Sequence, residues 1–384
     1  MISSCVRRYR PALLIPGDEL AISYLRMLHA RAIRGWDSNS RAVAELIEAS
    51  LGAPSSFAFG YQKSRLVSLA KAQGLLVPDT LIVRGIDEVR RFAEKSKFPL
   101  VLKRDESFGG RAVRIVDGVE EAVRAFVELR SSGGRFAALK QAAKKLDVAD
   151  LDRLWQRPPA IAMQRYIAGS PANRAVACSK GEVLAGLSVE VLQTAVPVGP
   201  ATVVRVIESE EMSRATRCLV RCLGLSGFVG FDFVLEAGTG RPFLIEMNMR
   251  PTQICHIALD GRSDLIGALF SELCGISRPR VLPNVGSQTI ALFPQECWRD
   301  PESDHLRSAY HDVPWRIPEF VLAYRRPVPA EPSSWLEAAG DRMRRLHYAL
   351  KRPVTRAATV NHPGVIDHAT NQPAVSQGSL FAHE

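Results

Sequence analysis

Two segments near the middle of the chain combine acidic and amide side chains with an alternating apolar pattern. Residues 228–236 and 242–249 alternate with the period of a β-strand, so each presents one apolar face. The apolar face expected for the second segment contains Phe243, Ile245, Met247 and Met249. Asp232 lies on the opposite face of the first segment, and Glu246 and Asn248 lie on the opposite face of the second. These side chains offer the oxygen ligands that Mg²⁺ prefers.

A hairpin between the two segments would bring the acids together. With Glu236 opposite Pro242, Asp232 lies opposite Glu246, and their Cβ atoms are ~4.5–5.5 Å apart. Like charges at that distance repel each other unless a cation lies between them, so we expect a metal site. Arg250 follows on the same face and is placed to meet an anion. The alternative is a half-exposed hairpin with its acids in water, and a register slip of one residue would turn the acids apart.

A lysine and a pair of glycines form a second candidate group. Residues 99–103 predict a buried strand that ends in Lys103, and a loop with Gly109 and Gly110 leads into the next strand, 112–116. Adjacent glycines let the backbone approach a phosphate closely, and a lysine at a strand end supplies a fixed positive charge. The alternative is an ordinary Gly-Gly hairpin with the lysine reaching solvent. Walker A and G-x-G-x-x-G sequences are absent.

Hydrophobic periodicity and turn residues predict the elements that hold these groups. Helices are expected after Asp18, at 40–50, 63–73, 87–97 and 119–127, between Ser209 and Gly224, and at 261–275. Further strands are expected at 12–15, 80–83, 160–166, 174–190 (a pair turning at Lys180-Gly181) and 201–207. Ser209 is a suitable N-cap and Gly224 a suitable C′ residue. A helical or looped insert is expected at 135–158, and irregular structure beyond Pro279.

Composition excludes several classes of protein. Of the 384 residues, 46% are hydrophobic and 23% charged, which excludes global disorder. No apolar run approaches the ~20 residues that span a bilayer, and the start of the chain lacks a secretory signal, so we expect a cytoplasmic protein without a membrane partner. Lysine and arginine (50) exceed aspartate and glutamate (40), and the net charge of +10 suits anionic ligands. The charge alone also allows a nucleic-acid-binding protein, but the basic residues are dispersed without a recognition motif, so we expect no such partner.

The seven cysteines are scattered and form no CxxC pair. Cys218 and Cys222 lie one helical turn apart and Cys255 precedes His256, so a zinc site can be drawn from them. Reduced, mostly buried thiols fit this spacing better. Cys255 is a weak candidate for a nucleophile because no base partner is evident.

Several motifs occur in a characteristic order. They are Pro99-Leu-Val-Leu-Lys103, Ser107-Phe-Gly109-Gly110, Gln164-Arg-Tyr-Ile167-Ala-Gly169, Asp232-Phe233 and Glu246-Met-Asn248-Met-Arg250. Together they resemble the ATP-grasp superfamily, which includes D-alanine–D-alanine ligase, biotin carboxylase and many carboxylate–amine ligases. The resemblance covers about residues 61–273 and is most specific at Glu-x-Asn-x-Arg. It implies an α+β, ATP-grasp fold in which two lobes sandwich ATP.

The resemblance also implies a domain order. The ATP-grasp N-lobe is expected at 61–158 and the C-lobe at 159–278, preceded at 1–60 by a truncated Rossmann-like preATP-grasp domain. A C-terminal extension at 279–357 and a flexible tail at 358–384 would complete the chain. Members usually begin with a complete preliminary domain, whereas here only its later part is recognisable.

The resemblance implies a role for each of the motif residues. The ATP-binding residues would be Lys63, Lys103, Ser107, Gly109, Gly110, Gln164, Arg165, Tyr166 and Ile167. In this set the serine and glycines would form a lid over the β/γ phosphates, and 164–167 would be the hinge strand, with the backbone around Arg165 and Ile167 bonding adenine. The metal ligands would be Asp232, Glu246 and Asn248. Arg250 and Lys103 would be catalytic, steadying the phosphoryl group. Many members have a glutamate where this chain has Gln164-Arg165, and Asn173 or Arg174 would have to compensate.

The implied activity is that of a ligase that forms a carbon–nitrogen bond. ATP, bound with Mg²⁺ or with Mn²⁺ in place of Mg²⁺, would convert a carboxylate into an acyl phosphate. An amine would then attack the acyl phosphate. The partners would be small-molecule carboxylate and amine substrates, and a homodimer is compatible with the resemblance. Arg205 and His256 are substrate-side candidates; a surface ion pair and a core or capping histidine are the alternatives. The alternative function is a catalytically inactive nucleotide-binding regulatory protein of the same fold.

Overall fold

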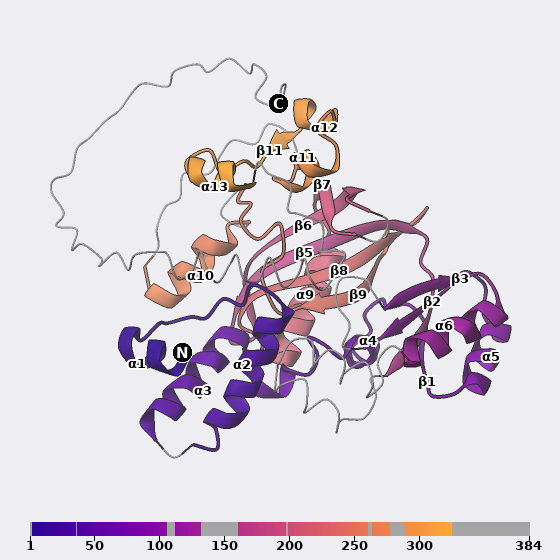
Figure 1. Ribbon diagram of the computed structural model, residues 1–384, viewed down its shortest axis with the longest axis horizontal. Coiled ribbons are helices and arrows are strands. Elements are labelled where there is room, and N and C mark those ends of the chain that lie inside the picture. Colours follow the sequence, from indigo (N-terminus) through magenta and orange to yellow (C-terminus); the bar gives the residue numbers. More distant parts are fainter. Residues whose placement is uncertain are drawn as a thin grey trace, which may run out of the picture. The chain divides into compact units, whose positions relative to one another are not determined.

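The computed structural model describes residues 2–35, 37–105, 112–131, 160–196, 199–259, 263–276 and 289–324. The chain forms two compact units, Met1–Asp312 and Val313–Glu384. The described part of the first unit contains a four-stranded and a seven-stranded sheet, with helices packed on them (Figure 1). The expected lid residues Ser107, Gly109 and Gly110, the insert at 135–158 and the tail at 358–384 lie outside the described residues.

The four-stranded sheet contains the strand that ends near Lys103. Its strands, in the order β1-β4-β2-β3, are β1 (Thr80–Val83), β4 (Ile161–Arg165), β2 (Leu100–Arg104) and β3 (Val113–Val116). Helices α5 (Ile86–Lys95) and α6 (Val119–Ser131) pack together and against it. Leu100, Leu102, Phe126 and Met163 form the centre of this core. The sequence predicted each of these elements, because their apolar periodicity is local.

The seven-stranded sheet contains the acid-bearing strands, in the order β11-β10-β7-β6-β5-β8-β9, where β10 is Thr289–Ala291 and β11 is Tyr310–His311. Its long strands are β5 (Gly169–Ser179), β6 (Glu182–Thr194), β7 (Ala201–Ile207), β8 (Gly227–Glu236) and β9 (Pro242–Asn248). The predicted turn between β5 and β6 is confirmed, with φ of 48° at Lys180 and 85° at Gly181. The predicted caps of α9 (Glu210–Leu223) are confirmed too, since Ser209 accepts a hydrogen bond from Met212 and Gly224 is left-handed.

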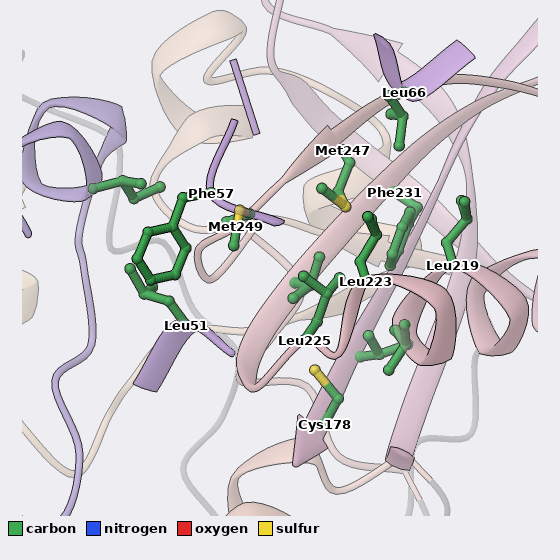
Figure 2. Packing of buried hydrophobic residues seen from close by; sticks show 14 of the residues in the cluster. Leu51, Phe57, Leu66, Cys178, Leu219, Leu223, Leu225, Phe231, Met247 and Met249 are labelled. Atoms are coloured by element: carbon green, nitrogen blue, oxygen red, sulfur yellow. The ribbon is translucent and has the colours of Figure 1, made fainter. Parts of the chain in front are cut away.

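One face of this sheet packs against α9 and the helices near the N-terminus. Leu219 and Leu223 of α9 lie beside Phe231 of β8, and Met247 and Met249 extend the same core (Figure 2). The opposite face has its own apolar cluster, which includes α10 (Leu265–Cys274). The short 3₁₀ helix η1 (Pro54–Ser56) precedes α4 (Lys63–Ala72), which packs on β9.

The segment before η1 is helical, with α1 (Ile2–Tyr9), α2 (Glu19–Ala32) and α3 (Ser38–Leu51). The strand predicted at 12–15 is wrong, because these residues join no sheet in the described part of the chain. Instead, the amide of Leu14 donates to the Ser50 hydroxyl of α3 at 2.9 Å. Four apolar residues cannot by themselves specify a strand when a helix offers a hydrogen-bond partner. The Rossmann-like domain therefore stays a prediction.

Residues 289–324 correct the expectation of irregular structure beyond Pro279. They form β10 (Thr289–Ala291), α11 (Gln295–Arg299), α12 (His305–Ser308), β11 (Tyr310–His311) and α13 (Pro318–Tyr324). Strand β10 pairs with β7 and buries Ile290 completely. Elements of two to seven residues are too short for periodicity to reveal. None of the helices within the described ranges is long and apolar enough to cross a membrane.

Candidate functional site

The hairpin of β8 and β9 places two carboxylates side by side. Asp232 and Glu246 are direct partners in the antiparallel register, as predicted. The predicted pairing of Glu236 with Pro242 is wrong, since Pro242 lies opposite Leu235.

A β-bulge explains the difference. Phe233 pairs with Leu244 and Asp232 with Glu246, so Ile245 is an extra residue in β9. Beyond the bulge the alternation is reversed: Leu244 is fully buried in the core with Met247, where Phe243 and Ile245 had been predicted. The acids themselves keep the orientation that the sequence indicated.

Asp232 is held by two amides. Asn173 of β5 donates to Oδ1 at 2.6 Å, and Asn248 of β9 donates to Oδ2 at 2.9 Å. Burial and the charge of Glu246 raise the pKa of Asp232 to about 6, against the opposing effect of these hydrogen bonds. The group therefore resists ionisation at the pH where most carboxylates are charged.

Two lysines approach the acids from other elements. The Lys63 Nζ, in the first turn of α4, lies 3.0 Å from Oε2 of Glu246. Lys103 of β2 is close enough to Glu246, Lys63 and Asp232 for their charges to act on it. Burial lowers the pKa of Lys103 to about 8, while the acids act to raise it. The predicted acids and both predicted lysines therefore converge on one place.

The donor set fits a divalent cation. Carboxylates from Asp232 and Glu246 and an amide oxygen from Asn248 are hard ligands of the kind that Mg²⁺ takes, usually with water and phosphate completing the shell. Burial, together with the charge of Glu246, raises the pKa of Asp232, and a bound cation would offset both effects. Within the described ranges, no cluster of three or more His, Cys, Asp or Glu could hold a metal, so a cation here would rely on the amide and on groups of the nucleotide.

Arg250, predicted to meet an anion, is already paired. Its guanidinium donates through Nε to Oε1 of Glu19 at 2.7 Å and through Nη2 to the same oxygen. Both side chains are about three-quarters buried, and Glu19 begins α2. An incoming anion would have to compete with this carboxylate.

The hinge residues divide between the core and the surface. Gln164 is buried, and its Nε2 donates to the Thr80 hydroxyl at 3.0 Å. The amide of Arg165 donates to the Asp79 carbonyl at 2.9 Å, so this N–H belongs to the sheet and a base would have to use other backbone groups. Tyr166 is exposed and Ile167 is buried.

The structure does not bring Arg205 to the acids. Arg205 is a register partner of Glu190, which pairs with Ala172, whereas Asp232 shares its row with Asn173. Neighbouring residues of a strand point to opposite faces, so Arg205 faces away from the carboxylates. It forms an ion pair with Glu190 at 2.5 Å, which is the alternative interpretation. Arg174, which bonds Thr216 and Ser188, faces the same way.

His256 lies in the loop after β9 and is half exposed. Its Nε2 is 2.8 Å from Asp312 Oδ2, and in the part of the chain that the structure describes it makes no hydrogen bond to the acid cluster.

The cysteines are all free, as predicted, but only Cys178 and Cys255 are buried, so the expectation of mostly buried thiols is wrong. Burial raises the pKa of Cys255, which agrees with its weak claim as a nucleophile.

Sequence reasoning missed three residues that hold the cluster. Asn173 was considered only for contacts to the nucleotide, whereas in the structure it bonds Asp232. Glu19 and Asp105, which bonds Ser64 of α4, were given no role at the site. Each contact joins segments more than 40 residues apart. The one local signal was a polar Asn173 on the strand face that also carries Ala175 and Ala177.

Comparison with known proteins agrees with this geometry. Residues 63–258, just over half of the chain, match the family described as "Carbamoyl-phosphate synthase L chain, ATP binding domain". The chain belongs to this ATP-grasp family, as the motifs predicted. The match begins at the lysine that pairs with Glu246 and includes every described residue of the acid cluster.

Solved structures resemble the chain more weakly. The biotin carboxylase domain of Hydrogenobacter thermophilus 2-oxoglutarate carboxylase, solved with MgADP and bicarbonate, has a TM-score of 0.48 and 16% identity over 73% of this chain and 57% of its own. Campylobacter jejuni biotin carboxylase has a TM-score of 0.49 and 14% identity over 73% and 58%. Bacillus licheniformis L-amino acid ligase has 0.45 and 17% over 70% and 66%. The chain thus spans less than two-thirds of each of these proteins.

Proposed function

We propose that this chain is an ATP- and Mg²⁺-dependent ligase that activates a carboxylate as an acyl phosphate and joins it to an amine. The observation that carries the proposal is the convergence of Asp232 and Glu246 with Lys63 and Lys103 at one place. A cluster of two acids and two ammonium groups suits a metal-bound triphosphate better than it suits a neutral ligand. Membership of the ATP-grasp family supports the same nucleotide.

In the proposed reaction a carboxylate oxygen attacks the γ-phosphorus of ATP, and ADP leaves. The amine nitrogen then attacks the acyl carbon, phosphate leaves with the bonding pair, and the nitrogen loses a proton. Asp232, Glu246 and Asn248 would hold Mg²⁺, which when bound neutralises phosphate oxygens. Lys63 and Lys103 would neutralise the remaining negative charge, which is most of what phosphoryl transfer needs from a protein.

Arg250 would complete the site once its guanidinium leaves Glu19. A guanidinium matches the planar oxygens of a carboxylate or acyl phosphate, and it keeps its charge at any physiological pH. The pairing with Glu19 sets a competition that the anionic substrate must win.

The assay is release of ADP and phosphate from ATP with Mg²⁺, across panels of carboxylates and amines. We expect turnover that requires both substrates and disappears in the double variant Asp232→Asn, Glu246→Gln. Arg205→Ala, on the opposite face of the sheet, is the matched control and should keep wild-type turnover. Turnover that survives in the double variant would contradict the proposal.

One observation favours a second function. Arg250 is already paired with Glu19, and a site whose arginine stays paired would suit a protein that binds a nucleotide without catalysis. Stoichiometric binding of Mg²⁺-ADP with no ADP formation for any substrate pair would select this regulatory function over the ligase.

A further inference from the structure

The first turn of α4 is capped by a residue from a distant part of the chain. Gln62, its N-cap residue, makes no side-chain capping bond. Instead, the amide of Ser64 donates to Oδ1 of Asp105 at 3.1 Å, and the Ser64 hydroxyl donates to Oδ2 at 2.5 Å. Asp105 lies 41 residues further along the chain, directly after β2, and is only 4% exposed.

Burying a carboxylate to cap this helix costs more free energy than capping it at the surface would. A serine or aspartate at the N-cap itself would satisfy the same amide at the surface. Burial raises the pKa of Asp105, and hydrogen bonds from Ser64 and the charge of Lys63 oppose that effect. A buried carboxylate is tolerated only where its partners are fixed, so its position in the fold needs another explanation.

The explanation lies in what the two bonded segments carry. Asp105 follows Lys103 by two residues, and its own amide donates to the Ala160 carbonyl at 2.8 Å, which fixes it at the end of the β2–β4 pair. Ser64 directly follows Lys63, whose ammonium group holds Glu246 of β9. One turn of α4 is therefore bound to the strand that carries one lysine and to the strand that carries a metal-site acid.

We propose that Asp105 is a positioning residue that fixes Lys63 relative to Lys103 for binding of nucleotide phosphates. It acts through Ser64 and touches no substrate. The same carboxylate occupies the positive end of the α4 dipole, so the phosphates are left to the two lysines rather than to helix amides. This inference rests on the proposed nucleotide site and adds a residue to it.

The experiment measures the Kd of ADP with Mg²⁺ by calorimetry in the full chain. Asp105→Ala should weaken binding about tenfold, the scale of one lost charge-assisted contact. Asp105→Asn keeps an acceptor for the Ser64 amide and should restore most of the affinity. Asp79→Ala is the matched control, because Asp79 is an exposed acid that pairs with Lys71 near the other end of α4, and it should bind as wild type.

A double-mutant cycle separates positioning from folding. If Asp105 acts through Lys63, Asp105→Ala causes no further loss of ADP affinity in a Lys63→Met background, although the thermal midpoint still falls. If Asp105→Ala lowered ADP affinity equally in the wild-type and Lys63→Met backgrounds, or lowered it in neither, the inference would be overturned. If Asp105→Ala does not fold, Ser64→Ala replaces it in the same cycle. Ser64→Ala removes only the 2.5 Å hydrogen bond between the Ser64 hydroxyl and Asp105. A wild-type chain that binds no nucleotide would instead refute the proposed function.

Discussion

Replacing Asp232 with asparagine should change how stability depends on pH. The folded pKa of Asp232 is raised from 3.8 to about 6, so the folded chain holds this proton more tightly than the unfolded chain. The contribution of Asp232 to wild-type stability therefore falls as pH rises from about 4 through about 6 and is flat above that range. The linkage amounts to about 1.4 kcal/mol between pH 5 and pH 8. Asp232→Asn has no titrating group at this position, so its stability does not fall with pH for this reason.

The readout is the thermal midpoint of variant and wild type in EDTA, at a fixed scan rate. Asparagine offers one acceptor to the two amides that Asp232 satisfies, so the variant also bears a pH-independent cost of about 1 kcal/mol. For this reason the informative quantity is how the difference in thermal midpoint between variant and wild type changes with pH. Relative to wild type, the variant should gain about 2 °C between pH 5 and pH 8.

Added Mg²⁺ supplies the second half of the same test. At pH 8 and in the presence of ADP it should raise the wild-type midpoint, because a cation and a nucleotide that bind only the folded chain stabilise it, and the variant should lose this response to Mg²⁺. Glu236→Gln, at the far end of β8, is the control and should keep it. A midpoint difference that does not change with pH, or an equal Mg²⁺ response in both proteins, would refute the reasoning.

Three further predictions concern single side chains. Because burial lowers the pKa of Lys103 to about 8, ADP affinity should fall as pH rises from 7 to 9; Lys103→Met should lose about 10–100-fold at pH 7, and calorimetry that finds no pH dependence would count against its role. Glu19→Gln should lower the KM for the carboxylate about fivefold by freeing Arg250, and a raised KM would mean that Glu19 holds the arginine in place. Arg205→Ala should leave kcat and ADP affinity within about twofold of wild type, since it faces the other side of the sheet, and a large loss in either would show that the face assignment is wrong.

Prediction from sequence succeeded where the signal was local. The acids of β8 and β9 lie within 15 residues of each other, and their alternation with apolar residues correctly predicted that Asp232 lies opposite Glu246. The same alternation failed at residues 243–245, because a bulge leaves no mark in the apolar pattern. Leu244 therefore lies in the core where the pattern predicted a solvent face.

Prediction failed where the partner comes from a distant segment. Asn173 reaches Asp232 only because β5 pairs with β8, and Asp105 reaches Ser64 only because β2 ends beside α4. The pairing of Arg250 with Glu19 joins residues 231 positions apart. Such contacts depend on tertiary arrangement, which no local propensity encodes. Arg205 was misplaced for the same reason, since its face depends on the register of β7 with β6.

A crystal structure with Mg²⁺ and a non-hydrolysable ATP analogue tests the central claim most directly. We expect the cation between Asp232 and Glu246, with Lys63 moved from Glu246 towards the phosphates and Lys103 in contact with them. A nucleotide bound elsewhere, or one bound with Lys63 still on Glu246 and no cation at the acids, would contradict the account.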